Sequence, residues 1–368
     1  MSKTLSLLAV GDIIIGANAE PFFEFVNPVL HQADVVVGQL EVPFTTQDRH
    51  TVEWGRIPAN LAPLVSSGFD AVTLASNHLM DAGEEGVEDT TAWLREHNIP
   101  YTGGGKDIAE ARRPVIIERE GTRFGFLNYS CVGPKETWAT TEKPGCAYVH
   151  VITHYELDHA TPGGPPNIYT WAESKTLNAM LDDIRKLRAQ CDVLTVAFHK
   201  GIAHTPAKLA EYEHQVSFAA IDAGADVVVG HHAHILKGIE VYKGKVIFHG
   251  LCNFVSWLPL LAPKSNDDAL SWAKRRRELF GFEPDPEYPT YPFHPDAKYT
   301  MIAQILVQDQ KVSQVGYIPC IVNKQGQPIV LKHDAEGQAV FDYVEKITRM
   351  ENMNAQFEWR GDQVVVRI

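Results

Sequence analysis

Side chains that could bind a metal ion recur just past short apolar segments of this 368-residue sequence. Because α/β proteins bind ligands beyond the carboxyl ends of their strands, residues in such places are predicted to converge on one crevice. Five segments that we predict to be strands are followed by such side chains: Leu5–Val10 by Asp12, Val35–Gly38 by Glu41, Ala71–Ala75 by Asn77 and His78, Val193–Phe198 by His199, and Val227–Val229 by His231, His232 and His234.

The chemical mixture of these side chains indicates which ions the crevice would hold. Oxygen and imidazole ligands suit Mn²⁺, Fe²⁺, Zn²⁺ or Mg²⁺, whereas metals that prefer thiolates would need cysteines, which this set lacks. The number of candidate ligands fits a centre of two divalent metal ions. Such a pair of ions activates water for hydrolysis, and hydrolysis is therefore the reaction class that we expect.

The elements that must position these residues are short strands alternating with amphipathic stretches, which is typical of the α/β class. The strands, including Val246–His249, are almost wholly apolar, as expected when both faces of a sheet are covered. Hairpins that turn at Glu120-Gly121 and Asp309-Gln310 predict mixed sheets. Periodicity and capping residues predict four helices: Pro21–Gln32, Glu84–His97, Ser174–Ala189 and Pro206–Ala223.

Two regions interrupt this alternation and are predicted to be surface insertions. They are His159–Asn167 and the segment Pro259–Pro295, which is rich in proline and charge. Insertions of this kind either lie over an active site and set its specificity or decorate the periphery. The sequence leaves both interpretations open.

Bulk properties exclude several classes of protein. A formal net charge of −13 opposes binding to nucleic acid or anionic lipid. No apolar stretch is long enough to span a membrane, and the apolar start of the chain is interpreted as the first strand rather than a signal peptide. Five scattered cysteines, an odd number without a C-x-x-C pair, indicate a reducing compartment, and we expect a cytoplasmic protein.

Three further residues are weaker candidates for substrate contact, each with an ordinary alternative. Arg56 could bind an anionic group or form a surface salt bridge. His204 could contact substrate or lie in a solvated loop, which is the more common situation. His232 could pack or touch substrate, and we do not expect it to bind metal. The basic run Lys274–Arg277 is interpreted as a solvated helix face.

In combination, several short motifs resemble the bacterial CapA/PgsA capsule-synthesis family, whose fold is similar to that of calcineurin-like metallophosphoesterases. The resemblance extends roughly from Leu5 to Phe254. It rests on Gly11-Asp12, Gln39-Leu40-Glu41, Ser76-Asn77-His78 with Asp81 and Gly83, Asp222 to Asp226, Gly230-His231 with His234, and Gly250 to Phe254.

The resemblance implies a four-layer α/β/β/α sandwich and a ligand set. Asp12 and His234 would hold one metal ion, Asn77, His199 and His231 the other, and Glu41 would bridge them. Three positions depart from the family pattern. Ile14 stands where the pattern has a histidine ligand, Cys252 stands where it usually has glycine, and Lys200 stands where it commonly has tryptophan. The loss of a ligand at Ile14 leaves open a site with one metal ion.

His78 is not expected to bind metal but to donate a proton to the leaving group or to neutralise transition-state charge. Asp81 would hold the imidazole of His78 in the useful tautomer.

We therefore expect a metal-dependent hydrolase that acts on a phosphoester bond or on an amide bond such as a γ-glutamyl linkage. The expected substrate is an anionic small molecule or short polymer. The alternative is a non-catalytic, metal-binding component of poly-γ-glutamate or capsule biosynthesis. The expected organisation is a core over residues 1–256, an insertion over 257–298, and C-terminal strands and a helix over 299–368 that complete or decorate the core.

Overall fold

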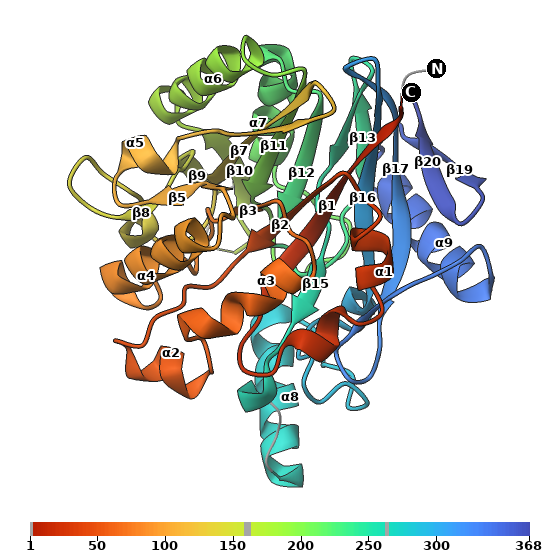
Figure 1. The fold of residues 1–368 in the computed structure, drawn as a ribbon. Coiled ribbons are helices and arrows are strands. Elements are labelled where there is room, and N and C mark those ends of the chain that lie inside the picture. The colour runs from red at the N-terminus through yellow and green to blue at the C-terminus, as the bar shows by residue number, and fades with distance from the viewer. Residues whose placement is uncertain (1–2, 158–162, 262–264) are drawn as a thin grey trace.

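Two large β-sheets face each other and carry helices on their outer surfaces in the computed structural model, which describes residues 3–157, 163–261 and 265–368 (Figure 1). The first sheet runs in the order β19-β20-β17-β16-β1-β2-β3-β4, with β15 paired to β1 and β18 to β17. Its strands are β1 (Leu5–Ile14), β2 (Val35–Leu40), β3 (Ala71–Thr73), β4 (Tyr101–Thr102), β15 (Asn253–Ser256), β16 (Tyr299–Gln308), β17 (Lys311–Val322), β18 (Pro328–Val330), β19 (Gln356–Arg360) and β20 (Gln363–Arg367).

The second sheet has the order β13-β14-β12-β11-β7-β6. Its strands are β6 (Val115–Arg119), β7 (Thr122–Ser130), β11 (Val193–His199), β12 (Val227–His231), β13 (Ile239–Tyr242) and β14 (Lys245–Phe248). Two small ribbons pair β5 (Gly104–Gly105) with β8 (Gly145–Cys146) and β9 (Val151–Glu156) with β10 (Asn167–Ala172). Parallel and antiparallel pairs occur in both large sheets, so the prediction of mixed sheets is confirmed.

The helices form the outer layers of the sandwich (Figure 1). Helix α6 and helix α7 cover the second sheet through buried side chains such as Ile184 and Val216. The helices are α1 (Asn27–Leu30), α2 (Arg49–Glu53), α3 (Ala62–Ser66), α4 (Gly83–Glu96), α5 (Ile108–Ala111), α6 (Ser174–Arg188), α7 (Glu211–Ala223), α8 (Asn266–Phe280) and α9 (Ala335–Met350). Short 3-10 helices occupy Glu20–Phe23, Pro58–Leu61, Lys135–Thr137, Pro259–Leu261 and Pro295–Lys298. The expected α/β/β/α architecture is thus confirmed.

The main core lies between the two sheets. Val10 and Val37 of the first sheet pack in one cluster with Ala197 and Val229 of the second. Every residue of β2 and β11 is buried, which explains why these strands are apolar at nearly every position rather than at alternate ones. This packing fixes the ends of both sheets relative to each other.

Two predicted helices are shorter than expected. The predicted helix Pro21–Gln32 is instead a 3-10 helix, Glu20–Phe23, followed by α1, because Pro28 cannot donate a hydrogen bond to the preceding turn and a new helix begins there. The helix predicted from Pro206 begins only at Glu211, since Ala207 has a φ of 57°, which an α-helix does not allow.

The predicted hairpins are confirmed at Glu120-Gly121, between β6 and β7, and at Asp309-Gln310, between β16 and β17. Strand β16 also pairs antiparallel with β1, so the C-terminal hairpin belongs to the same sheet as the first strand of the chain. Within the described ranges, no helix has the length and apolar composition that a bilayer span requires.

The two predicted insertions differ in character. The first includes residues 159–162, which lie outside the described residues, and its remaining part enters β10 at Asn167. The second carries helix α8, which projects from the body below β15 in the view of Figure 1. Phe293, near the end of the second insertion, is buried against the main core, so this segment is not peripheral decoration.

Candidate metal centre

Carboxylates from the first sheet meet histidines from the second where strands of both sheets end. Asp12 lies in β1 and Glu41 directly follows β2, while His199 and His231 end the paired strands β11 and β12. All four side chains are buried. Together with His234, which follows β12, they form what we call the candidate metal centre.

The distances within this centre are short enough for shared cation binding. His234 Nε2 lies 3.4 Å from Glu41 Oε1, and its Nδ1 lies 3.8 Å from Asp12 Oδ2. His199 Nδ1 lies 3.9 Å from Asp12 Oδ1, and its Nε2 lies 3.7 Å from Glu41 Oε1. One ligand atom each from Asp12, Glu41 and His234 fall within 4.8 Å of one another, which is a spacing that one ion could span.

Two glycines allow the backbone segments of the centre to approach each other. A Cβ atom on Gly11 would lie 2.0 Å from the Cys252 carbonyl oxygen, which accepts a hydrogen bond from the Asp12 amide. A Cβ atom on Gly230 would lie 2.1 Å from the His249 carbonyl oxygen. Any larger residue would push apart the strands that carry Asp12 and His231.

Several buried polar atoms of the centre have no hydrogen-bond partner among the described residues. They are Asp12 Oδ1, both Glu41 carboxylate oxygens, and Nδ1 of His199 and His231. Buried polar atoms are normally paired, and leaving a carboxylate unpaired is costly. Oxygen and imidazole nitrogen atoms are ligands of borderline and hard divalent ions, so these residues fit a metal ion well.

The electrostatics of the centre agree with this fit. Burial raises the pKa of Glu41 to about 7, although His78 and Arg56 oppose the rise. Burial, and then the charge of Glu41, raises the pKa of Asp12 well above its usual value. Burial also lowers the pKa of His231 to about 4. The imidazole is thus neutral near neutral pH, which is the form that binds metal.

A chain of hydrogen bonds fixes the ring of His234. The Tyr291 hydroxyl donates to the Ala297 carbonyl at 2.8 Å, so it accepts from Asn253 Nδ2 at 3.0 Å. Asn253 Oδ1 therefore faces His234 Nδ1 at 2.8 Å and accepts its proton. The lone pair of Nε2 is left pointing to the carboxylate side of the centre, as outer partners of metal-bound histidines usually arrange. Sequence reasoning missed the orienting roles of Asn253 and Tyr291.

His231 is oriented by the opposite sheet. Its Nε2 lies 3.1 Å from the Val10 carbonyl oxygen in β1, so this nitrogen donates and Nδ1 keeps its lone pair. The bond joins β12 to β1 at the point where the sheets approach. His231 and His234 therefore each have a single nitrogen available to a ligand.

Asn77 reaches the histidine side of the centre rather than the carboxylates. Its Oδ1 lies 2.8 Å from His199 Nε2 and 3.0 Å from His232 Nδ1. The His232 amide donates to Asp12 Oδ2 at 3.1 Å, and His232 has a φ of 83°. Such left-handed backbone in a non-glycine residue is strained and is commonly found at functional sites.

His78 and Asp81 form a pair at the edge of the centre. His78 Nδ1 lies 2.7 Å from Asp81 Oδ2, and the His78 side chain is 40% exposed. Burial alone would lower the pKa of His78, but the hydrogen bond to Asp81 and the charges of Glu41 and Asp81 raise it overall. Solvent access and an oriented ring are the properties that a proton donor needs.

The other two predicted contact residues, Arg56 and His204, have different surroundings. Arg56 is partly buried, its charge lowers the pKa of Glu41, and its Nε has no partner among the residues described here. His204 is only 8% exposed and stacks on His234 with ring centroids 5.5 Å apart. The interpretation of His204 as a solvated loop residue is therefore wrong.

The three departures from the family pattern have distinct structural consequences. Ile14 is buried in the main core and offers no ligand atom. Cys252 has a φ of 65°, in the left-handed region that favours glycine. Lys200 is wholly buried and belongs to a second cluster of charged residues.

This second cluster, the Lys200 network, was missed by sequence reasoning. Lys200 Nζ lies 3.1 Å from Glu213 Oε2 and 3.1 Å from His249 Nδ1. Glu240 Oε2 lies 3.0 Å from both His249 Nε2 and His214 Nδ1. The lysine ammonium makes His249 Nδ1 an acceptor, so His249 Nε2 carries the proton and donates to Glu240. The network therefore does not offer that nitrogen to a metal ion.

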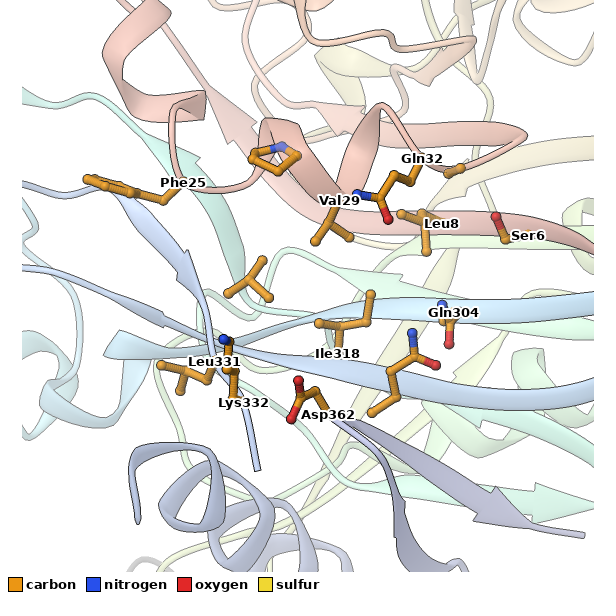
Figure 2. A pocket seen from close by; sticks show the side chains of 14 residues that line it. Ser6, Leu8, Phe25, Val29, Gln32, Gln304, Ile318, Leu331, Lys332 and Asp362 are labelled. Carbon is orange, nitrogen blue, oxygen red and sulfur yellow. The ribbon is translucent and has the colours of Figure 1, made fainter. Parts of the chain in front are cut away.

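A separate cavity of about 470 Å³ lies between α1 and the strands β16 to β18 (Figure 2). Leu8, Val29, Ile318 and Leu331 supply apolar walls, and Lys332 lies among them. None of the candidate metal ligands lines this cavity.

Fold and site define an α/β/β/α protein with buried carboxylates and histidines gathered where its two sheets meet. The chain belongs to the family described as bacterial capsule synthesis protein PGA_cap, whose profile matches residues 6–257. The resemblance seen in the motifs is therefore confirmed.

The chain is similar to the capsule biosynthesis protein CapA of Bacillus anthracis, with 26% identity over 69% of this chain and 60% of the relative. It is 28% identical to the PGA biosynthesis protein CapA of Bacillus subtilis over 68% of this chain and 63% of the relative. The chain thus spans less than two thirds of the length of these relatives.

Among solved structures, similarity extends to the calcineurin-like phosphoesterase YfkN of Bacillus subtilis. The identity is 14%, and the match covers 95% of this chain and 98% of that chain with a TM-score of 0.46. A novel phosphatase from Mycoplasma pneumoniae is 11% identical over 87% of this chain and 95% of that chain, with a TM-score of 0.48.

Proposed function

We propose that the protein is a metal-dependent hydrolase with a centre for two divalent ions. The observation that carries this proposal is the set of buried atoms on Asp12, Glu41, His199 and His231 that have no hydrogen-bond partner in the described part of the chain, beside the oriented His234. Bound there, divalent cations would supply an activated water and stabilise negative charge on oxygen.

The ligands divide as the family resemblance implies. Asp12 and His234 would hold one ion. The other ion would be held by Asn77, His199 and His231, and Glu41 would contribute to both. Neither carboxylate oxygen of Glu41 has a partner within the described ranges, which supports its shared position. The amide oxygen of Asn77 already lies within hydrogen-bond distance of His199, so the pair can approach one ion together. Mn²⁺, Fe²⁺, Zn²⁺ and Mg²⁺ all suit this set.

His78 would act on the leaving group. Its ring is oriented by Asp81 and partly open to solvent, and the raised pKa keeps it protonated to higher pH. It can therefore donate a proton to the leaving oxygen or nitrogen, or neutralise charge as the bond breaks.

The substrate would be anionic, and its scissile bond a phosphoester or an amide such as a γ-glutamyl linkage. The relative in Bacillus subtilis is named a PGA biosynthesis protein, and one in Mycobacterium tuberculosis a probable polyglutamine synthesis accessory protein. Both bond types develop negative charge on oxygen during cleavage, so one centre serves either. A cytoplasmic location remains our prediction from the cysteine content.

The second candidate function is a non-catalytic, metal-binding component of poly-γ-glutamate or capsule biosynthesis. The observation that favours it is Ile14, which is buried in the core where the family pattern has a ligand. A centre with one ligand fewer could keep a single ion for structure rather than for turnover.

Elemental analysis of protein purified without chelator or affinity metal tests the proposal. We expect close to two divalent ions per chain, lost in His231→Ala and retained in the control His154→Ala, which alters an exposed histidine of β9. One ion would favour the non-catalytic alternative, and no metal even after supplementation would refute both. With phosphodiester and γ-glutamyl substrates, His78→Asn should keep its metal and lose turnover; full turnover would refute the role of His78.

A further inference from the structure

The segment after β15 brings an aromatic surface onto the candidate metal centre. We call Phe280, Phe282 and Phe293 the aromatic wall. Their ring centroids lie 4.9, 5.5 and 5.9 Å from that of His204. Phe293 also lies 5.1 Å from the ring of His234. The wall therefore lies against His204 and, through Phe293, against the His234 side of the centre.

Arg276 lies one helical turn before Phe280 on α8 and follows the same surface. Its guanidinium carbon is 5.2 Å from the centroid of the Phe280 ring and 5.5 Å from that of Trp272. The ring of Phe280 contacts His204, which in turn stacks on His234 with ring centroids 5.5 Å apart. A continuous series of ring contacts therefore connects the guanidinium to His234.

Arg276 differs from the other cations of its helix. Lys274 and Arg277 are exposed and pair with Glu278 and Glu283, and Arg275 is exposed to solvent. Arg276 is partly buried, and no carboxylate among the described residues lies within ion-pair distance of it. Interpreting the whole run Lys274–Arg277 as a solvated face is therefore wrong at Arg276.

We propose that Arg276 is a specificity-determining residue that binds an oxyanion of the substrate, either a carboxylate or a phosphate, at the aromatic wall beside the candidate metal centre. This inference rests on the proposed function and names the group of the substrate that is recognised away from the scissile bond.

Three physical arguments support the proposal. A guanidinium binds carboxylate and phosphate oxygens in a bidentate manner, with matched geometry. The rings of Trp272 and Phe280 exclude water from one side of the Arg276 guanidinium, which strengthens its attraction for an anion. The chain as a whole carries a net charge of −13, so an anionic substrate needs a local cation to offset the general repulsion.

Titration calorimetry of the metal-loaded protein tests this role with two probes, inorganic phosphate and the dipeptide γ-glutamylglutamate. We expect Arg276→Gln to raise the dissociation constant of one probe about tenfold or more, since charged hydrogen bonds are the strong ones. Arg276→Lys should recover part of the affinity. The matched control is Arg275→Gln, which removes an exposed charge from the same helix and should leave both dissociation constants unchanged.

The outcomes show which kind of anion Arg276 binds, and they distinguish a failure of this proposal from a failure of the proposed function. Weakening for phosphate alone identifies a phosphate group, and weakening for the dipeptide alone identifies a carboxylate. Equal binding by wild type and Arg276→Gln, equal weakening by Arg275→Gln, or no binding of either probe overturns the role of Arg276. Metal content, measured on the same samples, judges the proposed function separately. If the wild type holds no metal, the same titration of metal-free protein still decides on Arg276.

Discussion

Two clusters of buried charged residues meet at consecutive positions of the chain, and they are built differently. His199 belongs to the candidate metal centre, and Lys200 belongs to the network with Glu213 and His249. In the first cluster, both Glu41 oxygens and one oxygen of Asp12 have no partner among the described residues. In the second, every interaction runs from a donor to an acceptor at ordinary hydrogen-bond distance.

The difference separates a structural cluster from a candidate functional one. Glu213 accepts from Lys200 and also from the Ala210 amide at 2.8 Å, so the buried charge is matched within the protein. Asp12 and Glu41 instead face each other as like charges, and burial raises the pKa of both. A buried charge that the chain does not match is the stronger indication of a ligand.

Breaking the matched cluster should have the largest effect on stability. Lys200→Met leaves Glu213 buried without its cation, and removing one partner of such a pair costs about 3–5 kcal/mol. Urea unfolding in the presence of a chelator measures this loss. The exposed Lys186→Met serves as the control and should change little.

The double variant Lys200→Met/Glu213→Gln sharpens this test, because it removes both charges. It should recover much of the stability, since replacing a whole buried pair is far less costly than breaking it. A loss below about 1 kcal/mol in the single variant would show that the pair is not matched as the structure indicates.

Neutralising the unmatched cluster should have the opposite sign. In metal-free protein, Glu41→Gln is expected to raise the free energy of unfolding by about 3 kcal/mol at pH 8, since the pKa of Glu41 is raised to about 7. The folded state binds this proton more tightly than the unfolded one, so wild-type stability falls as pH rises from about 4.5 to about 7. The variant should lack this fall.

The same substitution should weaken metal binding, which calorimetry with Mn²⁺ or Zn²⁺ measures. Stability lower than wild type in chelator at pH 8 would mean that the Glu41 carboxylate is matched by the protein after all, and the contrast between the clusters would disappear.

The pH dependence of stability tests the matched cluster through Glu240. Burial alone would raise its pKa, but the hydrogen bonds from His214 and His249 outweigh burial and lower it to about 2. Its contribution to stability is therefore present above the unfolded value of 4.5 and is lost as pH falls toward about 2. Glu240→Gln should cost about 2 kcal/mol at neutral pH and flatten the acid limb. Thermal unfolding between pH 5 and pH 2 measures this dependence. If the stability of Glu240→Gln falls with acid as much as that of the wild type, the prediction is wrong.

The carboxylates and histidines of the centre could be proposed from sequence because each comes within five residues of the end of a predicted apolar strand. That pattern places Asp12, Glu41 and His199 at the ends of strands, and the structure brings these three together. Tight turns such as Glu120-Gly121 could also be predicted, because a turn depends on only a few neighbouring residues. Local spacing was sufficient wherever one short segment determines where a side chain lies.

The Lys200 network could not be predicted because its partners come from separate elements. Glu213 and His214 lie on α7, Glu240 on β13, and His249 just after β14. Each of them alone looks like an ordinary polar residue, and only the packing of α7 on the second sheet unites them. The same holds for Tyr291, which comes from a proline-rich segment without any periodicity that would place it beside Asn253.

Tyr291 gives the smallest and most specific test of how the centre is positioned. Tyr291→Phe removes the hydroxyl that accepts from Asn253 Nδ2, so the amide of Asn253 is free to rotate and His234 loses its fixed tautomer. Loss of such an outer partner typically weakens metal affinity about tenfold, with little change in the free energy of unfolding of the metal-free protein. Competition with a metal-sensitive dye measures the affinity, and Tyr288→Phe, altering a half-buried tyrosine of the same segment, is the control. Unchanged affinity in Tyr291→Phe would mean that the carboxylates hold His234 without help, and that the insertion covers the centre without orienting it.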